Sequence, residues 1–189
     1  MSLDDADHLL SKRADAIYCA NVIAAWAERY IGTGHVEGKG DDVPSIEDGI
    51  VVQETGEGKF INAVSVNGHH TLRADDPLSV GGNDSGPTPY DYLLTALGAC
   101  KSMTMRMYAD RKKWPMDRAR VTLRHNKIHA EDCAVCETDE GKVDQFNVEI
   151  AIEGDLSDEQ RQKIYEISNR CPVHQTLINE TSVVSKLTD

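Results

Sequence analysis

The chain lacks a surplus of basic residues and lacks long apolar runs, and each absence excludes a class of partner. Lysine and arginine number 20 against 32 aspartate and glutamate residues, so the net charge is −12. No cluster of basic residues stands out, and we expect neither a nucleic-acid partner nor an anionic membrane partner. No apolar stretch approaches the roughly 20 residues of a membrane span. The acidic start MSLDDADHLL also lacks the basic residues and apolar centre of a secretory signal.

The sequence also lacks the paired cysteines of a disulfide-stabilised secreted protein. It has five cysteines, an odd number, and we expect a cytoplasmic protein whose thiols stay reduced. Each cysteine therefore has to be explained as a core residue, a metal ligand or a redox group. Cys19 lies on or beside the apolar face of a predicted helix, so we expect it to be a small buried residue.

The distribution of glycine divides the chain into an N-terminal extension and a larger domain. Apolar residues at helical spacing predict a helix over residues 4–31, and a polar, glycine-rich linker follows it. Alternating segments around an Asn-Gly pair predict a three-stranded antiparallel meander over residues 49–74. We therefore expect an extension over residues 1–47 and one domain over residues 48–189.

The second half of the chain alternates between helical and strand patterns. Its longest helical segment is apolar nearly all round, which is typical of a central, buried helix. Ser157 and Gln160 form the sequence pattern of a capping box, which marks the start of a helix. The predicted elements are a helix over residues 90–112, strands over 118–130 and 143–154, a helix over 158–170, a short helix from 172 and a last strand over 181–187. This order predicts an α+β fold with helices against antiparallel sheets.

Cys171 stands directly before Pro172, a residue that suits the first turn of a helix. We therefore expect Cys171 at or near the N-cap of a short helix, where the helix dipole favours a thiolate. His174, three residues later, is a candidate proton partner on the same helix face. Cys100 lies in the middle of a predicted helix and would need a nearby cation to become reactive. The residues alone thus favour Cys171 as the nucleophile and leave Cys100 as a small buried residue.

Two segments of the chain, GPTPYDYLLTALGACKSMTMRMYADRKKWP and DEQRQKIYEISNRCPVH, together resemble the OsmC/Ohr family. That family comprises osmotically inducible protein C and the organic hydroperoxide resistance proteins. The resemblance implies an intertwined homodimer with strongly curved antiparallel sheets packed on central helices, and active sites at the subunit interface. It also implies that Cys100 attacks the peroxide and that Cys171 resolves the sulfenic acid as a disulfide. This chemistry needs no metal and no organic cofactor.

The chain departs from the family where an arginine steadies the thiolate and a glutamate holds that arginine. Tyr90 follows the helix-opening proline in place of the glutamate, and no arginine occurs between residues 49 and 72. We consider Asp91, with Lys59 or Arg73, as a weaker substitute. Lysine lacks the planar two-pronged contact that arginine offers to a carboxylate.

A second candidate site combines two histidines with a Cys-x-x-Cys loop. His125 and His129 lie four residues apart on a predicted strand, so both imidazoles are expected on one face. Cys133 and Cys136 follow in a loop, and the set resembles half of a zinc site. The pair is alternatively a redox dithiol or two incidental thiols, and the sequence leaves these readings open.

The leading prediction from the sequence is an OsmC-like hydroperoxide reductase that takes part in oxidative stress defence. Its partners would be an organic hydroperoxide, an external dithiol reductant and a second copy of the chain. The alternatives are a catalytically lapsed dimer that binds or senses an apolar ligand, and a protein stabilised by zinc at the Cys133–Cys136 loop.

Overall fold

The computed structural model describes residues 12, 16–23, 43–132 and 140–188. The chain forms two compact units, residues 1–72 and 73–189. Residues 16–23 are helical, which confirms the central part of the helix predicted over residues 4–31. The remainder of that prediction falls almost wholly outside the described residues, and the domain boundary at residue 48 stays a prediction.

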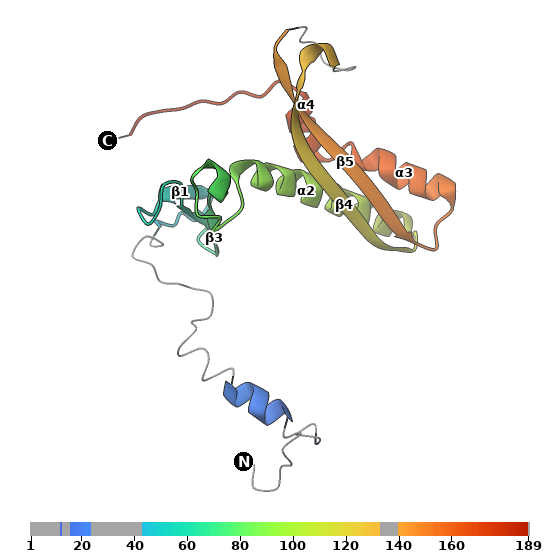
Figure 1. Ribbon diagram of the computed structural model, residues 1–189. Coiled ribbons are helices and arrows are strands. Elements are labelled where there is room, and N and C mark those ends of the chain that lie inside the picture. Colours follow the sequence, from blue (N-terminus) through green and yellow to red (C-terminus); the bar gives the residue numbers. More distant parts are fainter. Residues whose placement is uncertain (1–11, 13–15, 24–42, 133–139, 189) are drawn as a thin grey trace. The chain divides into compact units, whose positions relative to one another are not determined.

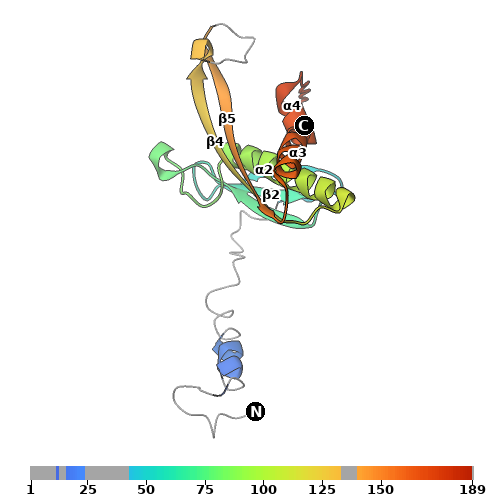
Figure 2. The same ribbon diagram turned by 90° about the vertical axis from the view of Figure 1, so that its right-hand side faces the viewer.

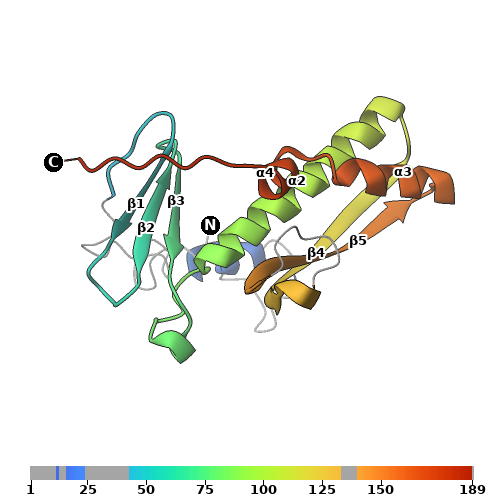
Figure 3. The same ribbon diagram turned by 90° about the horizontal axis from the view of Figure 1, so that it is seen from above.

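The first sheet is the predicted three-stranded meander. Strands β1 (Ile50–Glu54), β2 (Asn62–Val66) and β3 (His70–Ala74) lie in that order, as Figure 3 shows. β1 and β2 are antiparallel. Asn67 and Gly68 have φ angles of 51° and 67°, the left-handed pair that a two-residue hairpin turn requires. The Asn-Gly signal therefore predicted the turn between β2 and β3 correctly.

Helix α2 (Pro89–Lys112) has both of its ends defined by local side-chain and backbone chemistry. The Thr88 hydroxyl oxygen caps the helix by accepting a hydrogen bond from the Asp91 amide, and the Asp91 carboxylate accepts one from the Thr88 amide. Lys113 ends the helix in the left-handed conformation, with φ 55°. A short 3-10 turn, η1 (Leu78–Val80), lies in the loop that leads to α2. Among the described residues, no helix combines the length and apolar composition needed to cross a membrane.

The second sheet is one long hairpin of two antiparallel strands. β4 (Met116–His129) pairs with β5 (Lys142–Gly154), and Val121 lies opposite Ile150. The short 3-10 turn η2 (Ala130–Asp132) follows β4. Both strands were predicted, because their apolar and polar residues alternate with the period of a strand.

Two helices follow the hairpin, and both were predicted from their first residues. α3 (Asp158–Ser168) begins with the expected reciprocal hydrogen bonds between Ser157 and Gln160. α4 (Pro172–Ile178) begins at Cys171. The strand predicted over residues 181–187 was wrong, because this segment has no regular secondary structure. Its apolar side chains are 85–95% exposed, and apolar alternation makes no strand without a neighbouring strand to pair with.

The core of the second unit forms where α2 packs against β4 and α3, as Figures 1 and 2 show. Its buried members are Met105, Ala109, Met116, Leu156 and Ile164. α2 was predicted to be buried all round, but Met103 and Met107 are 65% and 73% exposed in the single chain. The helix therefore buries one face, and its residues there, Leu97, Lys101, Met105 and Ala109, recur every four positions.

Candidate active site

The fold brings together the two cysteines that the resemblance paired. Cys100 lies in the middle of α2 and Cys171 at the start of α4, and these two helices are in contact. Both thiols are free, and they lie near enough to each other that Cys100 contributes to raising the pKa of Cys171. Cys100 is partly exposed whereas Cys171 is completely buried. A reactant from solvent therefore has easier access to Cys100.

Cys171 is the N-cap of α4, as predicted from the proline that follows it. Its Sγ accepts a hydrogen bond from the His174 amide at 3.3 Å. The expected stabilisation of a thiolate at this position was wrong in its net direction. Burial raises the pKa of Cys171, and the His174 amide and the Lys101 charge only partly offset that effect. The Cys171 thiol therefore keeps its proton near neutral pH.

Lys101 is a site residue that sequence reasoning missed. Its side chain is 1% exposed, and its Nζ donates hydrogen bonds to Asn169 Oδ1 at 2.8 Å and to the Ser168 carbonyl at 3.3 Å. Burial lowers the pKa of Lys101, while negative charge at Cys171 or Cys100 raises it. The available signal was its position four residues from both Leu97 and Met105, on the buried face of α2.

His174 contacts Cys171 through its backbone amide. Burial lowers the pKa of its imidazole, and the nearby Lys101 charge lowers it further. The ring is therefore neutral near pH 7, which is the form that accepts a proton. Its role as a proton partner stays a prediction.

The three residues considered as substitutes for the family's arginine and glutamate have other contacts. Asp91 Oδ2 accepts hydrogen bonds from the amide and the hydroxyl of Thr88 at 2.9 and 2.7 Å. The Lys59 ammonium lies 4.6 Å from the centre of the Phe60 ring. The carbonyl of Arg73 accepts a hydrogen bond from the Tyr92 hydroxyl at 2.7 Å. The carboxylate of Asp91 is thus already used in capping α2, and the supporting roles of these residues stay predictions.

His125 belongs to an aromatic cluster between α2 and the β4–β5 hairpin. Its ring stacks on Tyr90 at 4.1 Å and lies 5.2 Å from Phe146. Its Nε2 lies 2.7 Å from Asp144 Oδ1, and this hydrogen bond is the main reason that the pKa of Asp144 is lowered. Tyr90, at the position of the family's glutamate, therefore packs on a histidine.

The zinc or dithiol hypothesis involves residues that the structure describes only in part. His129 is exposed, and Cys133 and Cys136 lie outside the described residues. Within residues 43–132 and 140–188, no three histidine, cysteine, aspartate or glutamate side chains form a cluster suited to a metal ion. The metal and dithiol readings of this loop stay predictions.

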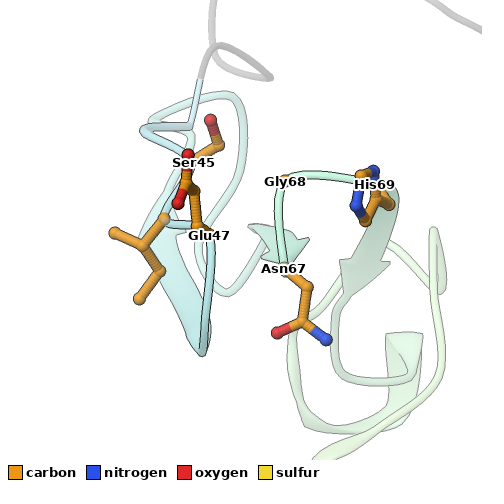
Figure 4. A pocket seen from close by; sticks show the side chains of 6 residues that line it. Ser45, Glu47, Asn67, Gly68 and His69 are labelled. Atoms are coloured by element: carbon orange, nitrogen blue, oxygen red, sulfur yellow. The ribbon is translucent and has the colours of Figure 1, made fainter.

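A shallow pocket lies between residues 45–47 and the Asn67–Gly68 turn, where Figure 4 shows the side chains of Ser45, Glu47, Asn67 and His69. Its lining residues are Ser45, Ile46, Glu47, Asn67, Gly68 and His69. None of the predicted site residues lines this pocket, so it carries no part of the cysteine chemistry.

Solved structures of low sequence identity share this fold. The chain is similar to an organic hydroperoxide resistance protein from Elizabethkingia anophelis, with a TM-score of 0.52, 19% identity, and coverage of 72% of this chain and 91% of that chain. It is also similar to an organic hydroperoxide resistance protein OsmC from Legionella pneumophila, with a TM-score of 0.51, 17% identity, and coverage of 68% and 87%. An OsmC-like protein of unknown function from Vibrio cholerae gives a TM-score of 0.53 at 10% identity, with coverage of 71% and 96%.

No curated protein matches the chain. A family model described as OsmC-like protein matches residues 81–186, a segment that contains both Cys100 and Cys171. This match spans more than half of the chain, and it agrees with the α+β architecture and the antiparallel sheets described above. The chain therefore belongs to the family of OsmC-like proteins.

Proposed function

We propose that this protein is a thiol-dependent peroxidase that reduces organic hydroperoxides with Cys100 and Cys171. The observation that carries the proposal is the contact between α2 and α4, which brings Cys100 near Cys171 although the two are far apart in the sequence. A two-cysteine mechanism needs one accessible thiol and a second thiol within reach of it. Cys100 is partly exposed and Cys171 is buried beside it, so they suit the attacking and the resolving role in that order.

The proposed reaction has three balanced steps. The Cys100 thiolate attacks the outer peroxide oxygen; an S–O bond forms, the O–O bond breaks, and the alkoxide leaves and takes a proton from water. The Cys171 sulfur then attacks the resulting sulfenic acid; an S–S bond forms and the hydroxyl leaves as water with the Cys171 proton. An external dithiol finally reduces the disulfide and is itself oxidised.

The proposed substrate is an organic hydroperoxide with an apolar substituent. Leucine, methionine and tyrosine dominate the helix around Cys100. Two similar structures are of organic hydroperoxide resistance proteins, and their names support the same substrate class. We place the reaction in the cytoplasm, where dithiol reductants maintain free thiols.

We further propose that the working form is a homodimer. α2 exposes Met103 and Met107, and the segment after α4 exposes Val183, Val184 and Leu187. Apolar surface of this extent on a single chain favours burial against a partner. A second copy would cover the face of α2 that the single chain leaves in solvent.

The test is peroxide consumption by the full chain with cumene hydroperoxide or hydrogen peroxide and a dithiol reductant. We expect rapid turnover in the wild type and none above background in Cys100→Ser. Cys171→Ser should turn over more slowly than the wild type, because the external dithiol must then reduce the Cys100 sulfenic acid directly. Cys19→Ser is the matched control and should keep full turnover.

Equal, slow consumption by the wild type and Cys100→Ser would refute the peroxidase proposal. The alternative function would then apply, namely a catalytically lapsed dimer that binds an apolar ligand. Its test is binding of a fatty-acid fluorophore to the reduced protein.

A further inference from the structure

We propose that the Lys101 ammonium is the counter-ion of the Cys100 thiolate. Lys101 would be a positioning residue, because it acts on the electrostatics of the cysteine pair and forms no bond to the peroxide. The inference deepens the proposed function and rests on it for its biological meaning.

Lys101 is buried on α2 near both cysteines. It follows Cys100 directly in α2, and its side chain is 1% exposed. An ammonium has three N–H groups. Two of them donate to Asn169 Oδ1 and to the Ser168 carbonyl, which lie at the junction of α3 and α4 beside Cys171. The junction that positions Cys171 thus also holds the lysine.

The buried ammonium of Lys101 has no carboxylate partner among the described residues. Both hydrogen-bond acceptors of Lys101 are neutral, and within the described part of the chain no carboxylate forms an ion pair with it. Burying an ammonium without an opposite charge is strongly unfavourable. The ionisable groups that interact with Lys101 are Cys100 on α2 and Cys171 and His174 on α4. Only the cysteines can supply a negative charge.

The two sulfurs differ in burial: Cys100 is partly exposed, whereas Cys171 is completely buried. Burial raises the pKa of Cys171, so its thiol keeps the proton. The negative charge that pairs with Lys101 therefore falls on Cys100. This arrangement supplies the cation that a mid-helix cysteine needs.

The test measures the reactivity of Cys100 without any peroxide. The reduced full chain is treated with iodoacetamide between pH 5 and pH 10, and mass spectrometry follows alkylation of Cys100. Because only the thiolate reacts, we expect Lys101→Gln to slow alkylation at pH 7 about tenfold and to shift the pH profile upward. Glutamine keeps the hydrogen-bond donors and removes only the charge. Lys101→Arg should restore the wild-type profile.

The matched control is Lys112→Gln, which removes the same charge from an exposed position of α2. It should leave the rate unchanged. If Lys101→Gln does not fold, Lys101→Met repeats the measurement, since an apolar chain of similar length suits a buried position. A neutral variant at position 101 with a wild-type profile would overturn the proposal.

The outcome for Lys101 is separable from that for the peroxidase. If alkylation depends on Lys101 but no peroxide is turned over, the counter-ion proposal stands and the peroxidase proposal is rejected. If turnover depends on Cys100 but Lys101→Gln leaves the pH profile of alkylation unchanged, the peroxidase proposal stands and the counter-ion proposal is rejected.

Discussion

At the scale of single residues, two charged groups are buried in the described part of the chain, and each is stabilised in a different way. Lys101 has neutral hydrogen-bond acceptors and a pair of sulfurs, as described above. Asp75 is 2% exposed and accepts hydrogen bonds from the amides of Asp76, Asn83 and Ser85 and from the Ser85 hydroxyl. Asp75 thereby organises the loop that leads into α2. Lys101 differs, because its two hydrogen-bond acceptors are neutral and its charge faces the sulfurs of the cysteine pair.

The hydrogen bonds to Asp75 make a testable contribution to stability. Burial opposes ionisation of Asp75, but the bonds from Ser85, Asp76 and Asn83 outweigh it and lower its pKa below 3.8. A carboxyl group whose pKa is lowered in the folded state stabilises the fold at pH values above its pKa in the unfolded chain. This stabilisation is lost as the pH falls through the pKa of the folded state. Asp75→Asn should therefore lower the melting temperature by several degrees at pH 7.

Thermal melts from pH 7 down to pH 2.5 check this expectation. The difference between the wild type and Asp75→Asn should shrink below pH 3.8, where the wild-type carboxylate becomes protonated. Asp84→Asn changes an exposed carboxylate in the same loop and is the control. A difference that stays constant over the whole range would contradict the assignment.

At the scale of elements, close packing of α2 on β4 decides where the helix lies. A Cβ atom at Gly98 would lie 2.8 Å from Leu123 Cδ1, closer than packed carbon atoms approach each other. Glycine in a helix normally costs about 1 kcal/mol relative to alanine. At position 98 the small residue lets α2 approach the hairpin, and Cys100 follows only two residues later.

Gly98→Val is expected to destabilise the protein by about 1–3 kcal/mol, because an overpacked interface forces side chains out of their preferred rotamers. Urea unfolding measures the change. Leu123→Ala in the same chain should recover part of the loss, because it removes the side chain that the valine meets. Ala96→Val, at an exposed position of α2, should cost only the difference in helix propensity, about 0.6 kcal/mol. Equal losses in the two valine variants would exclude a packing effect at Gly98.

At the scale of the whole molecule, the exposed apolar face of α2 bears on assembly. Light scattering after size exclusion should give twice the chain mass of 20.8 kDa. Met107→Asp should shift the protein toward the monomer, because a carboxylate at an apolar interface loses its hydration. Leu78→Asp changes a similarly exposed apolar residue in η1 and should leave the dimer intact. A monomeric wild type would reject the proposed assembly.

The sequence by itself determined the features that depend on near neighbours along the chain. The Asn67–Gly68 turn, the Ser157–Gln160 capping box and the N-cap position of Cys171 were all predicted and found. Each rests on hydrogen bonds or dihedral angles within about four residues, so the residue types suffice to define it. The α+β class followed from the same local signals taken in order.

Only the tertiary structure decided which distant residues meet. Contact between α2 and the α3–α4 junction joined Cys100 to Cys171 and buried Lys101 beside them. The same packing buried Cys171 and so reversed the expected direction of its pKa shift. The segment over residues 181–187 stayed without a strand, since its pairing depends on an edge that no local pattern specifies. Burial and charge at a site are sums over neighbours from several elements, and the order of residues along one element does not contain them.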